Sequence, residues 1–284
     1  MVSYIIREPE IDEIHNSIKV LYLSFDRTPP SHIKEEKKLW VYLINNNIAK
    51  FLIAVKEDKI FGIGGLFLFQ QVGSIGYMGV LSEYRGLGIG TEIFKKLMKI
   101  ALDLEYKTIM LYASKLGEKI YKKHGFQGSY YATTYLLPEK VPRLRIKNKN
   151  VKIISKLPDW LLKLDEETIG FDRSKYLKAK LVLGAKILTV ENEGFALISK
   201  VLSKVRLGPL IANNLDAALQ LIKKSIPLGA NNLIVPQHPF FKNEILTLMQ
   251  LTKKDGSTDL KMTYGEEMSR KLNYLYAIGS YAKG

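Results

Sequence analysis

Hydrophobic residues recur along the first half of the chain with two different periods, and each period predicts one kind of element. Apolar side chains three and four residues apart are typical of amphipathic helices, whereas short apolar runs between turn residues are typical of strands. The expected helices are residues 10–24, a charged helix with Trp40 inside 26–47, 88–105 and 116–123. The expected strands are residues 4–7, 51–56, 59–70, 72–81, 108–112 and 128–137. This mixture of helices and strands predicts an α/β protein.

The second half repeats the order of these elements, which indicates an internal duplication. A strand-turn-strand unit, a strand entering a helix, and a strand-loop-helix unit are expected at residues 187–199, 205–225 and 231–251. Between the halves, the run PEKVPRLRIKNKN is rich in proline and charge, as linkers are. We therefore predict domains at residues 1–140 and 151–284, joined by a linker at 141–150.

Details of the second half leave alternatives open. Gly208-Pro209 is expected to form a turn where the first copy has its glycine-rich loop, and Asn213-Asn214 to cap the next helix. Asp172-Arg173-Ser174 either caps a helix or faces the substrate. In the first half, Trp40 either lines an apolar acceptor pocket or packs in the core.

Composition narrows the class of protein. The chain has 284 residues, of which 46% are hydrophobic and 25% charged, as in ordered chains of one or two domains. It has no cysteine, which excludes disulfides, thiolate metal sites and cysteine nucleophiles. The histidines lack metal-site spacing, so no metal is expected; they are His15, His32, His124 and His238.

Neither a signal peptide nor a membrane span is apparent in the sequence. The first residues become charged before an apolar signal core can form, and the longest apolar run, residues 60–69, is too short to cross a bilayer. We expect a soluble cytoplasmic protein without a membrane partner. The sequence does not indicate an oligomeric state.

The net charge of +15 leaves three explanations open. A basic protein can bind nucleic acid, attract a polyanionic small molecule, or distribute lysines over a solvated surface. Because no recognition helix or aromatic RNA-binding signature accompanies the charge, we expect no specific nucleic-acid partner.

The stretch YRGLGIGTEIFKKLM, residues 84–98, is the strongest chemical signal. It places a glycine-rich turn between a strand and a helix, where unpaired N–H groups and the helix dipole favour an anion. Gly86, Gly88 and Gly90 would let the backbone approach phosphate oxygens, and Thr91 would add a hydroxyl. The sequence matches neither the P-loop nor the Rossmann pattern. A tight turn that binds nothing is the structural alternative.

Two motifs carry a family resemblance. SEYRGLGIGTEIFKKLM resembles the pyrophosphate loop of the GNAT acetyltransferases, Arg/Gln-x-x-Gly-x-Gly/Ala, with Arg85, Gly88 and Gly90 at the defined positions. ASKLGEKIYKKHGF resembles the same family's small helix and its Tyr-x-x-x-Gly-Phe ending. The resemblance covers about residues 4–137. The second half is more loosely similar to the C-terminal domain of two-domain members, through GFDRSKYL, LGPLIANN and YAIGSYAKG.

The resemblance implies a fold and an activity. The fold would be a central mixed, mostly antiparallel sheet flanked by helices, present twice, with a degenerate second copy that lacks the phosphate loop. The activity would be N-acetylation, in which a neutral amine attacks the thioester of acetyl-CoA, the co-substrate, directly. The alternatives are a catalytically silent acyl-CoA-binding protein and a basic nucleic-acid-binding protein.

The resemblance also implies which residues bind acetyl-CoA. Its pantetheine arm would pair with the backbone of Met78 and Val80 where the two central strands separate, and an N–H near Val80 would stabilise the oxyanion. Ser114 stands near the position of a pantetheine-contacting asparagine. The pyrophosphate would contact Arg85, Gly86, Leu87, Gly88, Ile89, Gly90 and Thr91.

Tyr121 matches the family's usual donor of a proton to the leaving thiolate. Its alternative role is a packed aromatic side chain. The strand SIGYMGV has no carboxylate to accept the amine's proton, and Glu83 is expected to be solvated, so the general base stays unassigned. The acceptor also stays open: a small amine, an aminoacyl compound, a protein N-terminus or a lysine side chain.

Overall fold

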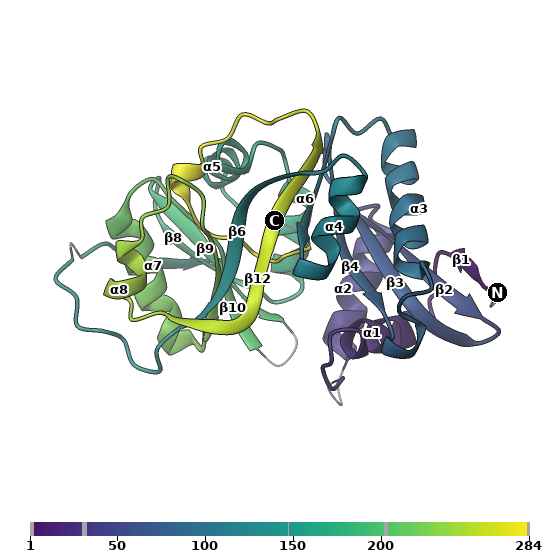
Figure 1. Ribbon diagram of the computed structural model, residues 1–284. Helices are drawn as coiled ribbons and strands as arrows, with labels where there is room; N and C mark the ends of the chain where they lie inside the picture. Colours follow the sequence, from purple (N-terminus) through teal and green to yellow (C-terminus); the bar gives the residue numbers. More distant parts are fainter. Residues whose placement is uncertain (1–2, 30–32, 147, 202–203, 283–284) are drawn as a thin grey trace. The chain divides into compact units, whose positions relative to one another are not determined.

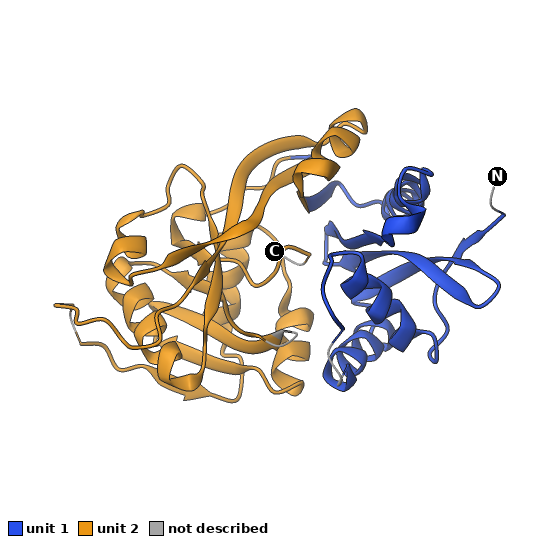
Figure 2. Cartoon of the chain, turned by 60° about the horizontal axis from the view of Figure 1, so that its bottom comes forward, with its two compact units in different colours: residues 1–111, 264–266, 283 blue, residues 112–263, 267–282, 284 orange. Residues whose placement is uncertain are grey.

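The computed structural model describes residues 3–29, 33–146, 148–201 and 204–282 (Figure 1). The chain forms two compact units (Figure 2). The first contains the chain up to Leu111 and the short segment Tyr264–Glu266, and the second begins at Tyr112. The chain leaves the first unit within strand β5 (Thr108–Ala113) and briefly returns to it at the end of strand β12 (Thr252–Gly265).

The first unit is a sheet with helices on both faces. Its strands follow the order β1-β2-β3-β4-β5, and every pair is antiparallel except β4 and β5. Besides β5, the strands are β1 (Ile5–Arg7), β2 (Ala49–Lys56), β3 (Lys59–Leu68) and β4 (Val72–Val80). Helices α1 (Ile14–Leu23) and α2 (Lys34–Asn45) cover one face, and α3 (Ile89–Asp103) covers the other (Figure 1).

Helix α3 packs closely on the sheet because β3 presents glycines to it. Ile93 and Leu97 are one helical turn apart and fully buried. A Cβ atom on Gly64 would lie 2.6 Å from a methyl group of Ile93 and 2.9 Å from one of Leu97. The close approach fixes the height of the N-terminus of α3 above the sheet, and the glycine-rich loop ends at that N-terminus.

The second unit is also a sheet with helices. Its strands follow the order β12-β6-β11-β10-β9-β8-β7, with β13 beside β10, and in the described part of the chain β10 and β11 are its only parallel pair. The strands besides β12 are β6 (Gln127–Leu136), β7 (Lys152–Ile154), β8 (Lys186–Val190), β9 (Gly194–Val201), β10 (Lys204–Ala212), β11 (Asn232–Pro236) and β13 (Leu275–Ala277). The helices are α4 (Lys115–Lys123), α5 (Asp159–Ile169), α6 (Ser174–Val182), α7 (Leu215–Ser225) and α8 (Glu244–Leu248).

The side chains of these strands alternate between the two faces of the second sheet. Leu188, Ala196 and Leu207 pack with α7 in one apolar cluster. Phe195, next to Ala196 on β9, and Ile211, between the cluster members Leu210 and Ala212 on β10, are fully buried but stand outside that cluster. Adjacent strand residues point to opposite faces, so these two lie on the other side, where α5 contacts β9 and β10.

The expected duplication is visible in the connections. In each unit two parallel strands are joined through a helix, β4-α3-β5 in the first and β10-α7-β11 in the second. The mixed, mostly antiparallel sheets flanked by helices confirm the predicted fold class.

The compact units differ from the predicted domains 1–140 and 151–284 because β6 pairs with β11 and β12 of the later sequence. The boundary at 141–150 stays a prediction.

Local expectations were mostly met, with two corrections. Gly208-Pro209 is not a turn: it lies inside β10, where the register with β9 shifts between Leu207 and Leu210. The helix expected from residue 10 begins at Ile14, because the Glu13 carboxylate binds the backbone N–H of Glu10 and holds a turn there. Asn214 does cap α7, since its side chain accepts a hydrogen bond from the N–H of Ala217.

Candidate functional site

The glycine-rich loop forms an open cradle at the start of α3. Gly86 and Gly88 have φ angles of +80° and +81°, which side-chain-bearing residues rarely adopt. A Cβ atom built on either would meet nothing within 4 Å. The first α-helical hydrogen bond runs from Glu92 N–H to Gly88 O, so the N–H groups of the residues between them have no partner in the helix. Unpaired donors, the helix dipole and free space suit a phosphate group.

The side chain of Arg85 secures this loop to the strand before it. Its Nε donates to Val80 O at 3.1 Å, and its Nη2 donates to Ser24 O at 2.8 Å, at the end of α1. The guanidinium is otherwise exposed. Arg85 therefore has a positioning role, because it fixes the loop against β4 and α1.

Among the described residues, no strand pairs with one edge of β4 between Gly76 and Val80, and we call this the free edge. Its pairing with β5 ends at Ile75 opposite Leu111, although β4 continues to Val80. A β-bulge at Tyr77, with φ +57°, places two residues of β4 opposite Gly64 of β3 and turns the strand at this point.

The direction of the backbone groups on β4 follows from its pairing with β3. The N–H of Leu81 donates to Phe61 O on β3. Because successive N–H groups of a strand point to opposite edges, Val80 N–H points to the free edge. This edge can therefore accept an extended ligand by backbone pairing.

Helix α4 of the second unit contains the other expected site residues. The Tyr121 ring folds back over Gly117, where an added Cβ atom would lie 2.8 Å from ring atom Cε2. Burial, followed by the charge of Asp259, raises the pKa of Tyr121 to about 12, so the hydroxyl keeps its proton at neutral pH. Ser114 is exposed at the start of α4, where its carbonyl accepts hydrogen bonds from Gly117 and Glu118.

Comparison with known proteins identifies the family. A family model described as "Acetyltransferase (GNAT) family" matches residues 12–126, and one described as "Acetyltransferase (GNAT) domain" matches residues 161–277. Together they cover more than half of the chain. It is a tandem GNAT acetyltransferase.

Relatives of this tandem GNAT acetyltransferase agree with that assignment. An uncharacterized N-acetyltransferase of Bacillus subtilis, YitH, is 27% identical over 230 residues, which are 78% of this chain and 79% of YitH. The crystal structure of a candidate acetyltransferase from Pyrococcus horikoshii is 29% identical, with a TM-score of 0.89, over 100% of this chain and 97% of the other. A tandem GNAT protein from the clavulanic acid pathway shares the fold at 11% identity and a TM-score of 0.59, over 93% and 98%.

The structure brings only some of the expected site residues of the tandem GNAT acetyltransferase together. Met78, Val80 and the loop from Arg85 to Thr91 lie in the first unit, where Arg85 contacts Val80 directly. Ser114 and Tyr121 belong to the second unit. Glu83 is exposed, as expected, and lies 4.0 Å from Lys59.

Two sets of contacts escaped the sequence analysis of this acetyltransferase, although Trp40 and Arg173 themselves were named there. Glu36 accepts hydrogen bonds from Trp40 and from Tyr77 at the bulge of β4. Trp40 itself is fully buried, so of its two expected roles the structure favours core packing over lining an acceptor pocket. Arg173 forms a bidentate ion pair with Asp165 at 2.8 and 2.9 Å, and both side chains are almost completely buried. The i, i+4 spacing of Glu36 and Trp40 on α2 could have indicated their hydrogen bond. The contact of Glu36 with Tyr77 and the pair of Arg173 with Asp165 are defined only by the tertiary fold.

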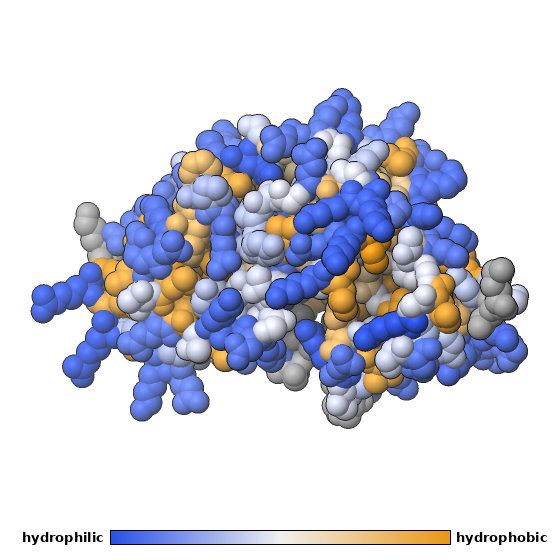
Figure 3. Space-filling model, in the orientation of Figure 1, coloured by the Kyte–Doolittle hydropathy of each residue, from blue (hydrophilic) through white to orange (hydrophobic). Residues whose placement is uncertain are grey.

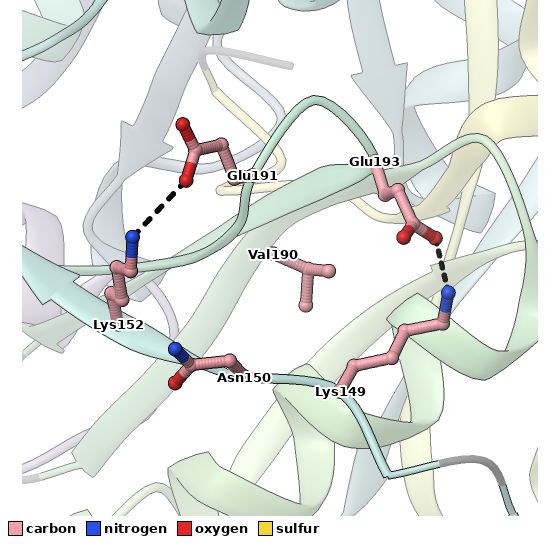
Figure 4. A pocket seen from close by; sticks show the side chains of 6 residues that line it. All are labelled: Lys149, Asn150, Lys152, Val190, Glu191 and Glu193. Carbon is pink, nitrogen blue, oxygen red and sulfur yellow. Dashed lines mark hydrogen bonds and ion pairs between the residues drawn. The ribbon is translucent and has the colours of Figure 1, made fainter.

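The pocket, the surface and the acidic side chains of the acetyltransferase give no further candidate site among the described residues. A shallow pocket in the second unit is lined by charged residues that pair with each other, Lys152 with Glu191 and Lys149 with Glu193 (Figure 4). Hydrophilic side chains are spread widely over the face seen in Figure 3. In the part of the chain that the structure describes, no helix is long and apolar enough to cross a membrane, and no three His, Asp or Glu residues cluster as metal ligands.

Proposed function

We propose that this acetyltransferase uses acetyl-CoA to acetylate an amine, and that the loop from Arg85 to Thr91 binds the pyrophosphate. The observation that supports this most is the loop itself: there is open space beside Gly86 and Gly88, and the N–H groups of the residues between Gly88 and Glu92 have no partner in the helix. The net charge of +15 would assist capture of the anionic co-substrate.

Each group then has a defined task. The free edge of β4 at Met78 and Val80 pairs with the pantetheine arm, and Val80 N–H stabilises negative charge on the thioester oxygen. Acetyl-CoA supplies the activated acetyl group. The amine nitrogen forms a bond to the acetyl carbon as the carbon–sulfur bond breaks. Tyr121 donates its proton to the leaving sulfur, the amide nitrogen loses a proton to solvent, and Ser114 contacts the pantetheine.

The experiment that tests this function combines binding with turnover. Titration calorimetry with acetyl-CoA is expected to give one equivalent bound per chain. Adding primary amines to the complex is then expected to release CoA thiol and an acetylated amine in equal amounts. Binding without amine-dependent thiol release would instead identify a silent acyl-CoA-binding protein, and absence of binding would reject the loop as a CoA site.

Replacing Tyr121 by phenylalanine is expected to reduce kcat about 100-fold without changing acetyl-CoA affinity, because general acids contribute about that factor. The raised pKa of Tyr121 keeps this donor protonated up to pH 10. The rate of the wild-type enzyme is therefore expected to rise as the amine deprotonates and not to fall again below pH 10. Steady-state thiol release between pH 6 and pH 10 measures both effects. A phenylalanine variant with wild-type kcat would assign Tyr121 to packing, with its ring against Phe126.

A further inference from the structure

Glu36 occupies an unusual position in the first unit. It lies on α2, half-buried, above the aromatic side chains that cover this face of the sheet. Its Oε1 accepts hydrogen bonds from Trp40 Nε1 at 3.1 Å and from the Tyr77 hydroxyl at 3.3 Å. Both donors are neutral, so they orient the carboxylate and leave its charge in place.

Among the described residues, this carboxylate forms no ion pair. The described residues place no lysine or arginine within 4.0 Å of Glu36, although the chain has 43 of them and a net charge of +15. Glu13 on the same face, by contrast, is paired with Arg7 at 2.6 Å. The described residues also give Oε2 of Glu36 no hydrogen-bond donor. A half-buried carboxylate with hydrogen bonds to only one of its oxygens gains stability when a ligand supplies a donor and a positive charge to the other oxygen.

The surroundings of Glu36 connect it to the free edge of β4. Trp40 stacks on Phe51 with ring centroids 4.0 Å apart, and Tyr77 stacks on Trp40 at 5.4 Å. The stack holds the two donors, and therefore Glu36, in one orientation. Tyr77 is the bulged residue directly before Met78, where the pantetheine arm is proposed to pair. Glu36 is thus fixed, through one hydrogen bond, to the segment that would present the acetyl group.

We propose that Glu36 binds the acceptor: its Oε2 receives the ammonium group of a protonated primary aliphatic amine beside the Tyr77 ring. The bound ammonium then loses one proton to solvent before its nitrogen attacks the thioester, because only the neutral amine has a lone pair. Aromatic faces and a carboxylate both favour a cation over a neutral ligand. This inference rests on the proposed function, since an acceptor site has meaning only in an acetyltransferase. It makes Glu36 a specificity-determining residue, and it narrows the acceptor to a cationic amine.

The test measures amine binding directly, without turnover. Wild type, Glu36→Gln and Glu35→Gln are saturated with CoA and titrated calorimetrically with 1-aminobutane hydrochloride and with 1-butanol. Glu36→Gln keeps an amide oxygen for Trp40 and Tyr77, and Glu35→Gln makes the same charge change at an exposed position one residue away. We expect Glu36→Gln to weaken amine binding at least about 10-fold, Glu35→Gln to leave it within about twofold, and the alcohol not to bind.

A second variant tests the same site in case Glu36→Gln perturbs folding. Tyr77→Phe retains the ring and removes one of the two donors, and it is expected to weaken amine binding about threefold. Equal affinity of wild type and Glu36→Gln, or wild type that binds acetyl-CoA but not the amine, would overturn the inference while the proposed function stands. Failure of acetyl-CoA to bind wild type would reject the proposed function instead.

Discussion

Replacing Gly88 by glutamate is expected to weaken acetyl-CoA binding at least about 100-fold, or about 2.8 kcal/mol. Gly88 is the residue before α3 and has φ +81°, and the space next to its Cα is empty. A glutamate there would fill the open space and place a negative charge where the N–H groups at the start of α3 are proposed to bind the pyrophosphate. Titration calorimetry of wild type and variant with acetyl-CoA measures the change.

A matched control separates ligand exclusion from backbone strain. Gly229 follows a short helical turn in the second unit, has φ +93°, is exposed, and also has nothing within 4 Å of an added Cβ atom. Gly229→Glu therefore imposes the same strain and charge change at a distance from the loop in sequence, and it is expected to leave acetyl-CoA affinity unchanged. Wild-type affinity in Gly88→Glu, or an equal loss in both variants, would mean that the glycine turn is structural.

Replacing Asp165 by alanine is expected to lower the free energy of unfolding by about 3–5 kcal/mol. The Arg173 side chain is 1% exposed and forms two hydrogen bonds to Asp165, so removing the carboxylate takes an anionic partner away from a buried cation. Urea unfolding followed by circular dichroism measures the loss. The pair belongs to the second unit. If the two units unfold in separate transitions, the transition of the second unit is expected to move to lower urea concentration and that of the first unit to stay unchanged.

The control for this prediction is an ion pair of similar distance at the surface. Lys99 and Asp103 are 2.8 Å apart on α3 and both are exposed. Asp103→Ala is expected to change stability by no measurable amount, because solvent screens exposed pairs and their side chains lose entropy on pairing. A small effect of Asp165→Ala, equal to that of Asp103→Ala, would show that the buried pair is not needed to hold α5 and α6 together.

The features that sequence predicts well here are local. The loop from Arg85 to Thr91 could be predicted because glycine spacing, the preceding strand and the amphipathic helix are contiguous in sequence. The hairpin of β2 and β3 and the cap at Asn214 have the same origin, since turn residues and cap residues act on their neighbours. These are the elements for which helical or strand periodicity and the flanking residues agree.

The features that sequence missed depend on pairing between distant segments. Gly208-Pro209 has the composition of a turn, but β9 on one side and β11 and β13 on the other keep it in a strand. Strand β6 has the pattern of the last strand of the first half, yet its partners β11 and β12 begin only at Asn232 and Thr252. Glu36 reads as an ordinary charged residue on a helix, because its relation to Tyr77 exists only after α2 has packed on the sheet.

The central claim is that the chain moves an acetyl group from acetyl-CoA to an amine, and label transfer tests it most directly. The protein is mixed with acetyl-CoA labelled in the acetyl group and a set of primary aliphatic amines, and the products are separated by mass. The account predicts label in the acetylated amine together with an equal amount of free CoA thiol. Label that remains in acetyl-CoA, with one equivalent bound and no amine acetylated, would contradict it.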